Sequence, residues 1–539
     1  MAGPSEKDQN PTAEEKKEAE ESEENGNRGR GGRGENEDEN GGEEEEYEEE
    51  EEEGERKSGG GPPSEREKVE RLLRRLSSGP VRLRVHDVVI RGNAKTKDSL
   101  IEAEVLDAFR SASTMQELFQ AAGAANERLR RMDVFDSVSI TLDAGPPELP
   151  GTANVIIDVA EAKNPLTGDI GILTKPEARS WSLEGSLKLK NLSGYGDIWD
   201  ASGAYGWDQA SEISAGLSLP RFKAISTPLM ARVSLLSQDW LKFSSYKEHL
   251  LGLSFGLLST THHNLAYNLT WRNLTDPSRT ASKIVRRLLG HSLLSSVKYT
   301  YKIDRRDSHL RPTRGYAFLS TTQVGGLGPY SKSLRFIRQE FDLRGAFHLG
   351  FYNSAAALNI GVAAGAILPW GRGFMDLPSP LPERFYMGGH SSPVCNLSGP
   401  TSLLGFRTRG LGPTDSRRFI ASKSDKDDSP ASSERDVLGG DLAVAAFVDL
   451  SFDLPFKLFR ESGIHGHVFI NAGNLAKLTE NTFKDFSFWN FGESFRSSAG
   501  FGIIFPTKLF RMEINYCYIL KQFGHDNGKT GLQFNFSSP

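Results

Sequence analysis

The stretch FRMEINYCY, from Phe510 to Tyr518, decides the class of fold because its apolar and polar residues alternate strictly. Successive side chains of an extended chain point to opposite faces. One face of this strand carries Phe510, Met512, Ile514, Tyr516 and Tyr518, and the other carries Arg511, Glu513 and Asn515. An aromatic, apolar face opposite a charged face suits a strand with lipid on one side and water on the other. The stretch therefore favours a transmembrane β-barrel.

The same period of two recurs between residues 164 and 539. It is found in SLEGSLKLKNL (Ser182–Leu192), LGLSFGLL (Leu251–Leu258), LAYNLTW (Leu265–Trp271) and KTGLQFNF (Lys529–Phe536). The longest runs reach the roughly 9–11 residues that a tilted strand needs to cross a bilayer. Because every backbone polar group in lipid needs a partner, a sheet of such strands has to close. We therefore predict an all-β transmembrane barrel over residues 164–539, with a large soluble β protein as the alternative.

Residues 79–163 follow a different pattern, which predicts a small α/β domain. VRLRVHDVVI (Val81–Ile90) is expected to form a strand. Two amphipathic helices follow, the first starting with Asp98 as its N-cap and the second capped by Thr114. Two more strands are expected at Ser137–Asp143 and Ala153–Glu161. The order β-α-α-β-β indicates one sheet covered by two helices.

Residues 1–78 form an acidic tail that we expect to be disordered. Residues 1–56 hold 24 acidic and 7 basic residues, and the rest of the chain holds 47 and 58. A segment with so few apolar residues cannot bury enough surface to offset the entropy of ordering it. One RGRGGRG segment (Arg28–Gly34) within this tail does not predict a nucleic-acid partner. The first 25 residues lack an apolar run, so no secretory signal is expected.

Four sequence segments, found in the same order along the chain, resemble those of a known family. They are YKIDRRDSHLRPTRGY (Tyr301–Tyr316), GPTSLLGFRTRGLGP (Gly399–Pro413), HVFINAGNL (His467–Leu475) and the terminal KTGLQFNF. Together they resemble the outer-membrane protein-assembly superfamily, over about residues 80–539. Its members carry polypeptide-transport-associated (POTRA) domains before a barrel of about sixteen antiparallel strands. The single α/β domain resembles one POTRA domain. The combination is similar to the mitochondrial branch, the barrel subunits of the sorting and assembly machinery.

That resemblance implies a function, a location and partners. The expected activity is the insertion of β-barrel precursor proteins into the mitochondrial outer membrane. The chain would be integral to that membrane, in contact with its lipid, with the POTRA domain in the intermembrane space. Peripheral sorting-and-assembly subunits are the other partners implied. A chloroplast outer-envelope import or assembly barrel and a passive porin-type channel are the alternatives.

A closed barrel has one seam, between its first and last strands, and we expect this seam to act as a lateral gate. The first strand is expected at Leu166–Thr174. Its predicted gate residues are Gly168 and Gly171, which weaken the strand, together with Ile170 and Leu173. The last strand is expected at Thr530–Phe536. Family clients end in a polar-x-Gly-x-x-hydrophobic-x-hydrophobic signal, which this terminus resembles. The matching residues are Lys529, Gly531, Phe534 and Phe536.

The family's lumenal loop motif is changed in this chain. Its usual Arg-Gly-Phe core is Leu404-Gly405-Phe406 here. In many members that arginine meets an aspartate in a Phe-x-Asp-x-Gly strand motif, and the matching residues here are Phe469, Asn471 and Gly473. Because both charges are absent, two possibilities stay open. The contact is neutral, or Arg407 or Arg409 supplies the charge from a shifted position.

The remaining candidates do not predict a catalytic or cofactor site. GHDNGKT near the terminus lacks both the spacing and the following helix of a phosphate-binding loop. His465 and His467 would share a face with Asn471, but without a carboxylate in the pattern they do not predict a metal. No nucleophile and base occur together, so we expect no enzyme activity and no cofactor. The polar segment Ala421–Asp436 is expected to be a surface loop.

Overall fold

The computed structural model describes most of the chain after the acidic tail. The described residues are 82–175, 180–207, 210–221, 227–328, 335–351, 354–370, 378–389, 391–395, 397–418, 434–455, 457–478, 486–507 and 511–537. The tail predicted at residues 1–78 lies outside these ranges, as does most of the polar segment predicted to be a surface loop.

The first unit has the predicted order β-α-α-β-β. Its elements are β1 (Arg84–Arg91), α2 (Asp98–Ser111), α3 (Met115–Arg131), β2 (Phe135–Ala144) and β3 (Thr152–Glu161). The sheet order is β1-β3-β2, with β1 parallel and β2 antiparallel to β3. Both helices and the sheet share one apolar core, which includes Ile101, Leu118 and Ile157. The sheet leaves β1 and β2 as its edge strands.

One of the two predicted helix caps in this unit is correct. The Thr114 hydroxyl accepts a hydrogen bond from the Glu117 N–H at 3.3 Å, so Thr114 caps α3 as expected. The prediction for Asp98 is wrong, because Lys97 is the N-cap of α2 and makes no side-chain cap bond. Asp98 instead lies in the first helical turn, where a carboxylate is favoured by the helix dipole.

The second unit is a sheet of 16 strands, in agreement with the predicted barrel. Each sequential neighbour in this sheet pairs antiparallel, and a long segment separates the eleventh strand from the twelfth. The strands are β4 (Leu166–Lys175), β5 (Ser180–Lys190), β6 (Ile198–Gly206), β7 (Ser211–Leu219), β8 (Leu229–Asp239), β9 (Lys247–Ser259), β10 (His263–Thr275), β11 (Gly290–Asp304), β12 (Gly315–Gly325), β13 (Phe336–Phe351), β14 (Ser354–Pro369), β17 (Leu442–Asp453), β18 (His465–Ala476), β19 (Arg496–Pro506), β20 (Arg511–Lys521) and β21 (Gly531–Ser537). No helix among the described residues is long and apolar enough to span a membrane.

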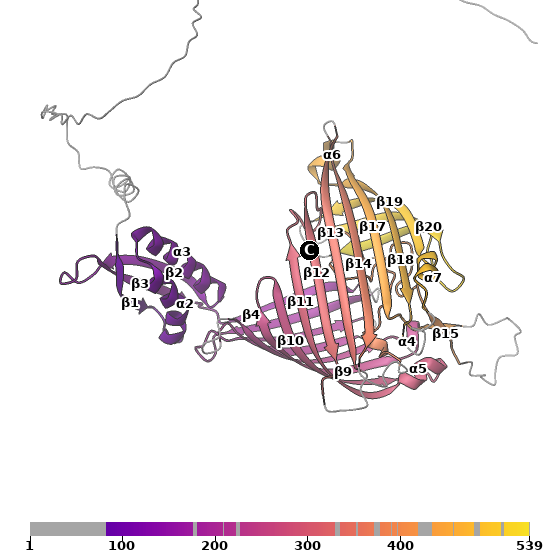
Figure 1. The fold of residues 1–539 in the computed structure, drawn as a ribbon, viewed down its shortest axis with the longest axis horizontal. Helices are drawn as coiled ribbons and strands as arrows, with labels where there is room; N and C mark the ends of the chain where they lie inside the picture. The colour runs from indigo at the N-terminus through magenta and orange to yellow at the C-terminus, as the bar shows by residue number, and fades with distance from the viewer. Residues whose placement is uncertain are drawn as a thin grey trace, which may run out of the picture. The chain divides into compact units, whose positions relative to one another are not determined.

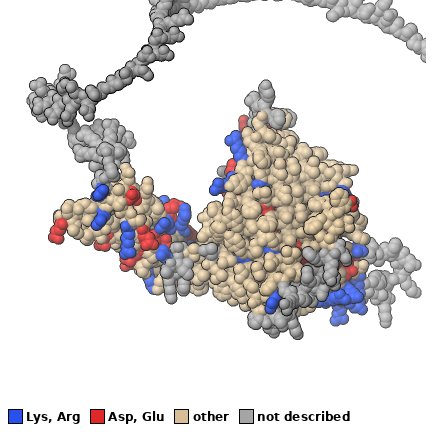
Figure 2. Space-filling view, in the orientation of Figure 1, with Lys and Arg blue, Asp and Glu red and all other residues tan. Residues whose placement is uncertain are grey.

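The two faces of the sheet differ as the alternation predicts. In β20 the side chains of Arg511, Glu513 and Asn515 are buried on the inner face. Tyr516 and Tyr518 on the outer face are 43% and 60% exposed. The barrel face in Figure 2 is accordingly almost free of charged side chains between its two ends. An apolar outer belt of this kind is what lipid contact requires.

The even number of strands fixes which turns share an end of the barrel. The chain enters β4 and leaves β21 at the same end, here called the near end; the opposite end is the far end. The short helix α6 (Lys457–Glu461) follows β17 and lies at the near end. The helices α4 (Leu241–Ser244), α5 (Lys283–Leu288) and α7 (Phe488–Glu493) follow strands that end at the far end. Figure 1 shows α4, α5 and the short strand β15 (Thr414–Ser416) gathered at one end and α6 at the other.

Candidate functional site

The pairing of the barrel sheet stops at its first and last strands. β4 pairs with β5, from Leu166 opposite Leu189 to Lys175 opposite Ser180. β21 pairs with β20, from Gly531 opposite Cys517 to Ser537 opposite Arg511. Among the described residues, the sheet records no pairing between β4 and β21. Each of these strands therefore presents one edge of N–H and C=O groups without a strand partner.

The first strand has little side-chain support. Leu166 to Gly171 are all exposed, and Ile170 is 86% exposed. A Cβ on Gly171 would meet nothing within 4 Å, whereas one on Gly168 would lie 3.0 Å from a Leu187 methyl. Leu173 lies on β4 opposite Ser182, and its side chain is outside what the structure describes. These four predicted gate residues thus share one weakly packed strand.

The last strand is packed on its inner face. Gln533 and Asn535 are completely buried, while Leu532 and Phe534 are each 59% exposed on the outer face. Phe536 pairs with Met512 through its backbone, and its side chain is not among the described ones. The strand is therefore oriented with polar groups toward the lumen and apolar groups outward.

Gly531 in the terminal signal is explained by its backbone conformation and not by a close approach of strands. No heavy atom would lie within 4 Å of a Cβ at this position, so close approach is not the reason for glycine. Its φ is +110°, a conformation that residues with a Cβ rarely adopt. The glycine is required by the backbone at the start of the strand. Lys529 lies in the preceding turn, where its N–H donates to the Gly405 carbonyl at 2.8 Å.

The segment between β14 and β17 enters the barrel and brings the loop motif to the last strands. Leu404 is buried and packs with Phe469 of β18 and Cys517 of β20. Its carbonyl accepts a hydrogen bond from the Ser498 hydroxyl at 2.5 Å. The Gly405 N–H donates to Oε1 of Gln533 in β21, at 3.4 Å. The loop therefore contacts four of the last five strands of the barrel.

The backbone of the motif also joins the turn between β20 and β21. Phe406 forms an isolated β-bridge with Gly528. The Arg407 N–H donates to the Asn527 carbonyl at 2.9 Å, and the Asn527 N–H donates to Gly410 at 2.8 Å. Gly405 has a φ of +90°, and a Cβ there would lie 2.9 Å from Cβ of Ser498. Glycine is thus required both by the backbone conformation and by the close approach to β19.

The strand motif meets the loop through packing and not through charge. Phe469 contacts Leu404, and a Cβ on Gly473 would lie 2.6 Å from the sulfur of Met387, a residue of the same loop. Both polar side-chain atoms of Asn471 are buried without a hydrogen-bond partner. The loop and the strand motif therefore meet through the neutral side chains of Leu404 and Phe469, and Asn471 makes no hydrogen bond to the loop.

The two arginines considered as substitutes do not supply the missing charge. The Arg407 side chain is exposed. The Arg409 guanidinium lies 3.4 Å from the ring centroid of Trp240 and 3.8 Å from that of Tyr386. It therefore makes a cation–π contact with the turn after β8 and with the loop itself. Arg409 joins the loop to the middle strands and not to Asn471.

A second anchor of the loop was not predicted from the sequence. Glu383, in a short 3-10 helix (Leu381–Glu383), contacts Arg272 of β10 at 2.6 Å and Arg338 of β13 at 3.5 Å. Burial opposes the ionisation of Glu383, but Arg272 and Arg338 hold its pKa below the usual range. No local pattern marks this contact, because the partners are more than 40 residues apart.

The inner wall of the last strands contains a buried polar network. Arg511 Nε contacts Glu513 Oε1 at 2.8 Å, and Asn515 donates to the other oxygen of Glu513 at 3.0 Å. Both ring nitrogens of His467 are engaged, with Asp449 at 2.6 Å and with Asn515 at 2.7 Å. His467 and His465 are buried on the inner face with Asn471, as the alternation predicts. The described residues contain no group of three or more His, Cys, Asp or Glu that could hold a metal ion.

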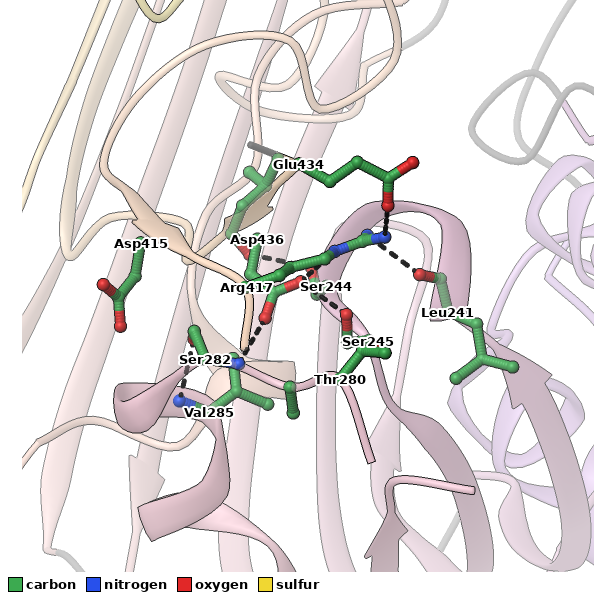
Figure 3. A network of polar contacts seen from close by, with 12 residues as sticks. Leu241, Ser244, Ser245, Thr280, Ser282, Val285, Asp415, Arg417, Glu434 and Asp436 are labelled. Atoms are coloured by element: carbon green, nitrogen blue, oxygen red, sulfur yellow. Dashed lines mark hydrogen bonds and ion pairs between the residues drawn. The ribbon is translucent and has the colours of Figure 1, made fainter. Parts of the chain in front are cut away.

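The end of the predicted surface loop is buried, which corrects that prediction for Asp436. This residue is completely buried in β16 (Arg435–Val437), the partner of β15. Its carboxylate accepts hydrogen bonds from Ser245 at 2.6 Å, the Ser282 N–H at 2.8 Å and Arg417 at 2.8 Å (Figure 3). These partners lie at least 19 residues away in sequence, so a local pattern could not identify them. The network fixes β15 and β16 between α4 and α5.

Comparisons with known proteins agree with this architecture. The chain matches the Omp85 superfamily domain over residues 191–538 and a POTRA model, described as a surface antigen variable number repeat, over residues 83–162. It is 30% identical to the mouse sorting and assembly machinery component 50 homolog, over 83% of this chain and 89% of that protein. Identity to the human homolog is also 30%, with the same coverage. BamA from Haemophilus ducreyi lacking POTRA domains 1–3 has a similar fold, with a TM-score of 0.63, 16% identity and 84% of each chain covered.

Proposed function

The chain belongs to the Omp85 superfamily, as a mitochondrial outer-membrane barrel with one POTRA domain, and from this premise we propose that it inserts and assembles β-barrel precursor proteins. The names of its relatives support assembly as the activity, since they are components of a sorting and assembly machinery. The mitochondrial specificity of this activity and its route through a lateral gate are parts of the proposal.

The observation that carries the proposal is the break in strand pairing between β4 and β21. An interior strand has two paired neighbours, so admitting a guest there breaks a complete ladder of hydrogen bonds. At the sheet ends, an arriving strand gains backbone partners that the edge already offers. Backbone groups then remain paired during transfer to lipid, which is the condition for stability in a bilayer. No nucleotide, cofactor or catalytic residue is needed for this exchange.

The receiving edge in this proposal is β4. Its exposed residues and its two glycines make its pairing weak and its edge accessible. β21 is held by the loop, through the Gln533 and Lys529 contacts with Gly405, and is the less mobile of the two. A guest strand built on the same polar-Gly-hydrophobic pattern as Lys529–Phe536 would pair with the open edge of β4, on the side of the seam that faces β21.

The remaining parts of the chain have supporting roles in this proposal. The POTRA domain would lie in the intermembrane space and receive precursors at the edges of its sheet, β1 or β2. Peripheral sorting-and-assembly subunits would then meet the far end of the barrel. The filled lumen of the later strands, where Leu404 and Phe406 are buried, disfavours a passive channel as the main function.

Import of a radiolabelled porin precursor tests the proposal. Mitochondria depleted of the chain should take up the precursor but fail to convert it to the integrated, protease-resistant form. Resupply of the wild-type chain should restore integration, and resupply of residues 164–539 without the POTRA domain should restore it more slowly. Normal integration in the depleted organelle would contradict the proposed function and leave a passive channel as the better account.

A further inference from the structure

The far end of the barrel carries a basic patch that the assembly function does not use. We define the far-end basic patch as Lys242 of α4, Arg279, Lys283, Arg286 and Arg287 in and before α5, and Arg418 after β15. All six residues are exposed. Figure 2 shows Lys and Arg gathered over the region of α5, in contrast to the uncharged belt beside it. We propose that this patch binds the anionic phospholipid headgroups of the adjacent membrane leaflet.

The patch is held in place by buried contacts. Lys283, Arg286 and Arg287 occupy one side of α5, spaced three and four residues apart. Val285, on the other side of the helix, is buried in an apolar cluster with Trp240 and Tyr246. The orientation of the basic side is therefore fixed by the packing of the apolar side.

The network around Asp436 joins the other members of the patch to α5. The Arg417 guanidinium donates to the Lys242 carbonyl at 3.0 Å, next to its bond with Asp436. The Arg418 N–H donates to the Thr280 carbonyl at 3.0 Å, one residue from Arg279. Figure 3 shows this network from close by, with Arg417 between Glu434 and Leu241 and Asp436 beside it. The six cations thus belong to one locally fixed surface.

The described acidic residues around the patch, in the ranges 276–292 and 415–436 outside 419–433, are engaged with other groups. Asp436 and Glu434 bind Arg417, at 2.8 and 2.6 Å. Asp415 accepts from the Ile284 N–H at 3.3 Å, and Asp276 from the Ala281 N–H at 3.0 Å. In the part of the chain that the structure describes, none of the six patch cations has a side-chain hydrogen bond or ion pair. Their charge is therefore available to an external anion.

The position of the patch favours a lipid headgroup over other anions. On the outer face of β10 and β11, Trp271 stacks on His291 at 5.3 Å and is 42% exposed. Aromatic side chains of this kind mark the interface between the hydrocarbon core and the headgroups. β10 continues for four residues beyond Trp271, about 13 Å along the strand and about 10 Å along the membrane normal at the usual strand tilt, before the loop that contains α5. The patch therefore lies beyond the aromatic level, at the height expected for headgroups.

The chemistry of the surface also disfavours a protein partner. Between residues 276 and 292, all of them described, no large apolar side chain is exposed. Stable protein interfaces depend on a few buried aromatic or aliphatic anchors, which this surface lacks. Headgroup binding requires only cations near an anionic surface. The inference concerns lipid and stands independently of the lateral gate.

Photocrosslinking with lipid probes tests the proposal. The full chain is reconstituted in phosphatidylcholine vesicles that contain a trace of phosphatidylinositol or phosphatidylcholine carrying a diazirine near its headgroup. Adducts are then mapped on peptides that cover residues 241–247 and 276–292. We expect the anionic probe to label these peptides preferentially. Changing Lys283, Arg286 and Arg287 to Gln should lower that labelling at least about fivefold, the factor that one cation near an anionic surface contributes.

The matched control changes Arg128, Arg130 and Arg131 of α3 to Gln. It removes the same charge outside the barrel and should leave the labelling of the patch unchanged. Equal labelling by the two probes, or labelling that survives the Lys283, Arg286 and Arg287 substitutions, would overturn the proposal. So would protection of the patch from the anionic probe in the native complex, relieved when peripheral subunits are removed, since that result would assign the patch to a protein partner.

Discussion

The first and last strands of the barrel are joined to the rest of the molecule in different ways. At the end of the sheet, Glu513, Gln533 and Asn535 are completely buried beneath the lumenal loop. At its beginning, the inner-face pair Asp200 and Arg232 keeps 21% and 49% of its side chains exposed. The loop contacts that the structure describes fall on β9 and later strands and on the turn after β8. The two sides of the seam are therefore unequal: the last strand is held by the loop, and the first strand has little support.

The largest expected difference between the two sides is in the free energy of unfolding that each loses when one member of an ion pair is removed. Glu513→Ala leaves the buried guanidinium of Arg511 without its carboxylate and should lower the free energy of unfolding by about 3–5 kcal/mol. Asp200→Ala makes the same truncation beside the half-exposed Arg232 and should cost less than about 1 kcal/mol. Urea unfolding of the refolded barrel in detergent micelles measures both values. Equal costs would remove the proposed inequality between the two sides.

A smaller effect is expected on the outer face of the last strand. Phe534→Asp places a carboxylate among the lipid tails and should cost on the order of 2 kcal/mol, which lowers the yield of membrane-integrated protein. Phe534→Leu keeps an apolar side chain at the same position and should integrate normally. Carbonate extraction after import compares the two variants. Full integration of the aspartate variant would show that the last strand does not depend on its lipid-facing residues.

The smallest expected difference is between the effects on stability of replacing two glycines by alanine. Gly405→Ala combines a positive φ with a 2.9 Å approach to Ser498, so it should destabilise the loop by about 1–3 kcal/mol. Gly171→Ala meets nothing within 4 Å and should change stability by less than about 1 kcal/mol. Limited proteolysis of the lumenal loop, together with urea unfolding, measures both. If the loop of the Gly405 variant keeps wild-type protease resistance, it is not held through the contacts described.

The sequence predicted the elements that depend on local periodicity. Alternation placed Arg511, Glu513 and Asn515 on one face, because a strand has a period of two wherever it lies in the sheet. The position of the seam between β4 and β21 followed from the order of the strands along the chain, but the missing pairing across it did not, because a closed sheet was expected. The Thr114 cap was also predictable, since its hydrogen-bond partner is three residues away.

The features that the sequence did not predict depend on contacts between distant parts of the chain. Asp436 belongs to a polar stretch, and only its three buried partners distinguish it from a surface residue. The position of Arg409 between Trp240 and Tyr386 requires the path of the loop through the lumen, which no local pattern specifies. For Gly531, the sequence could not show whether the lack of space for a Cβ or the backbone conformation requires a glycine.

Disulfide trapping shows whether a guest strand pairs with β4 during insertion. In a background without Cys395 and Cys517, single cysteines across Gly168–Leu173 are combined with a panel of cysteines in the final strand of a porin precursor. We expect crosslinks in one register during import, and none from matched positions on the interior strand β12. A second panel joins β4 to β21: oxidised closure should stop integration, and reduction should restore it. Integration at the normal rate through a verified closed seam would contradict insertion through the lateral gate.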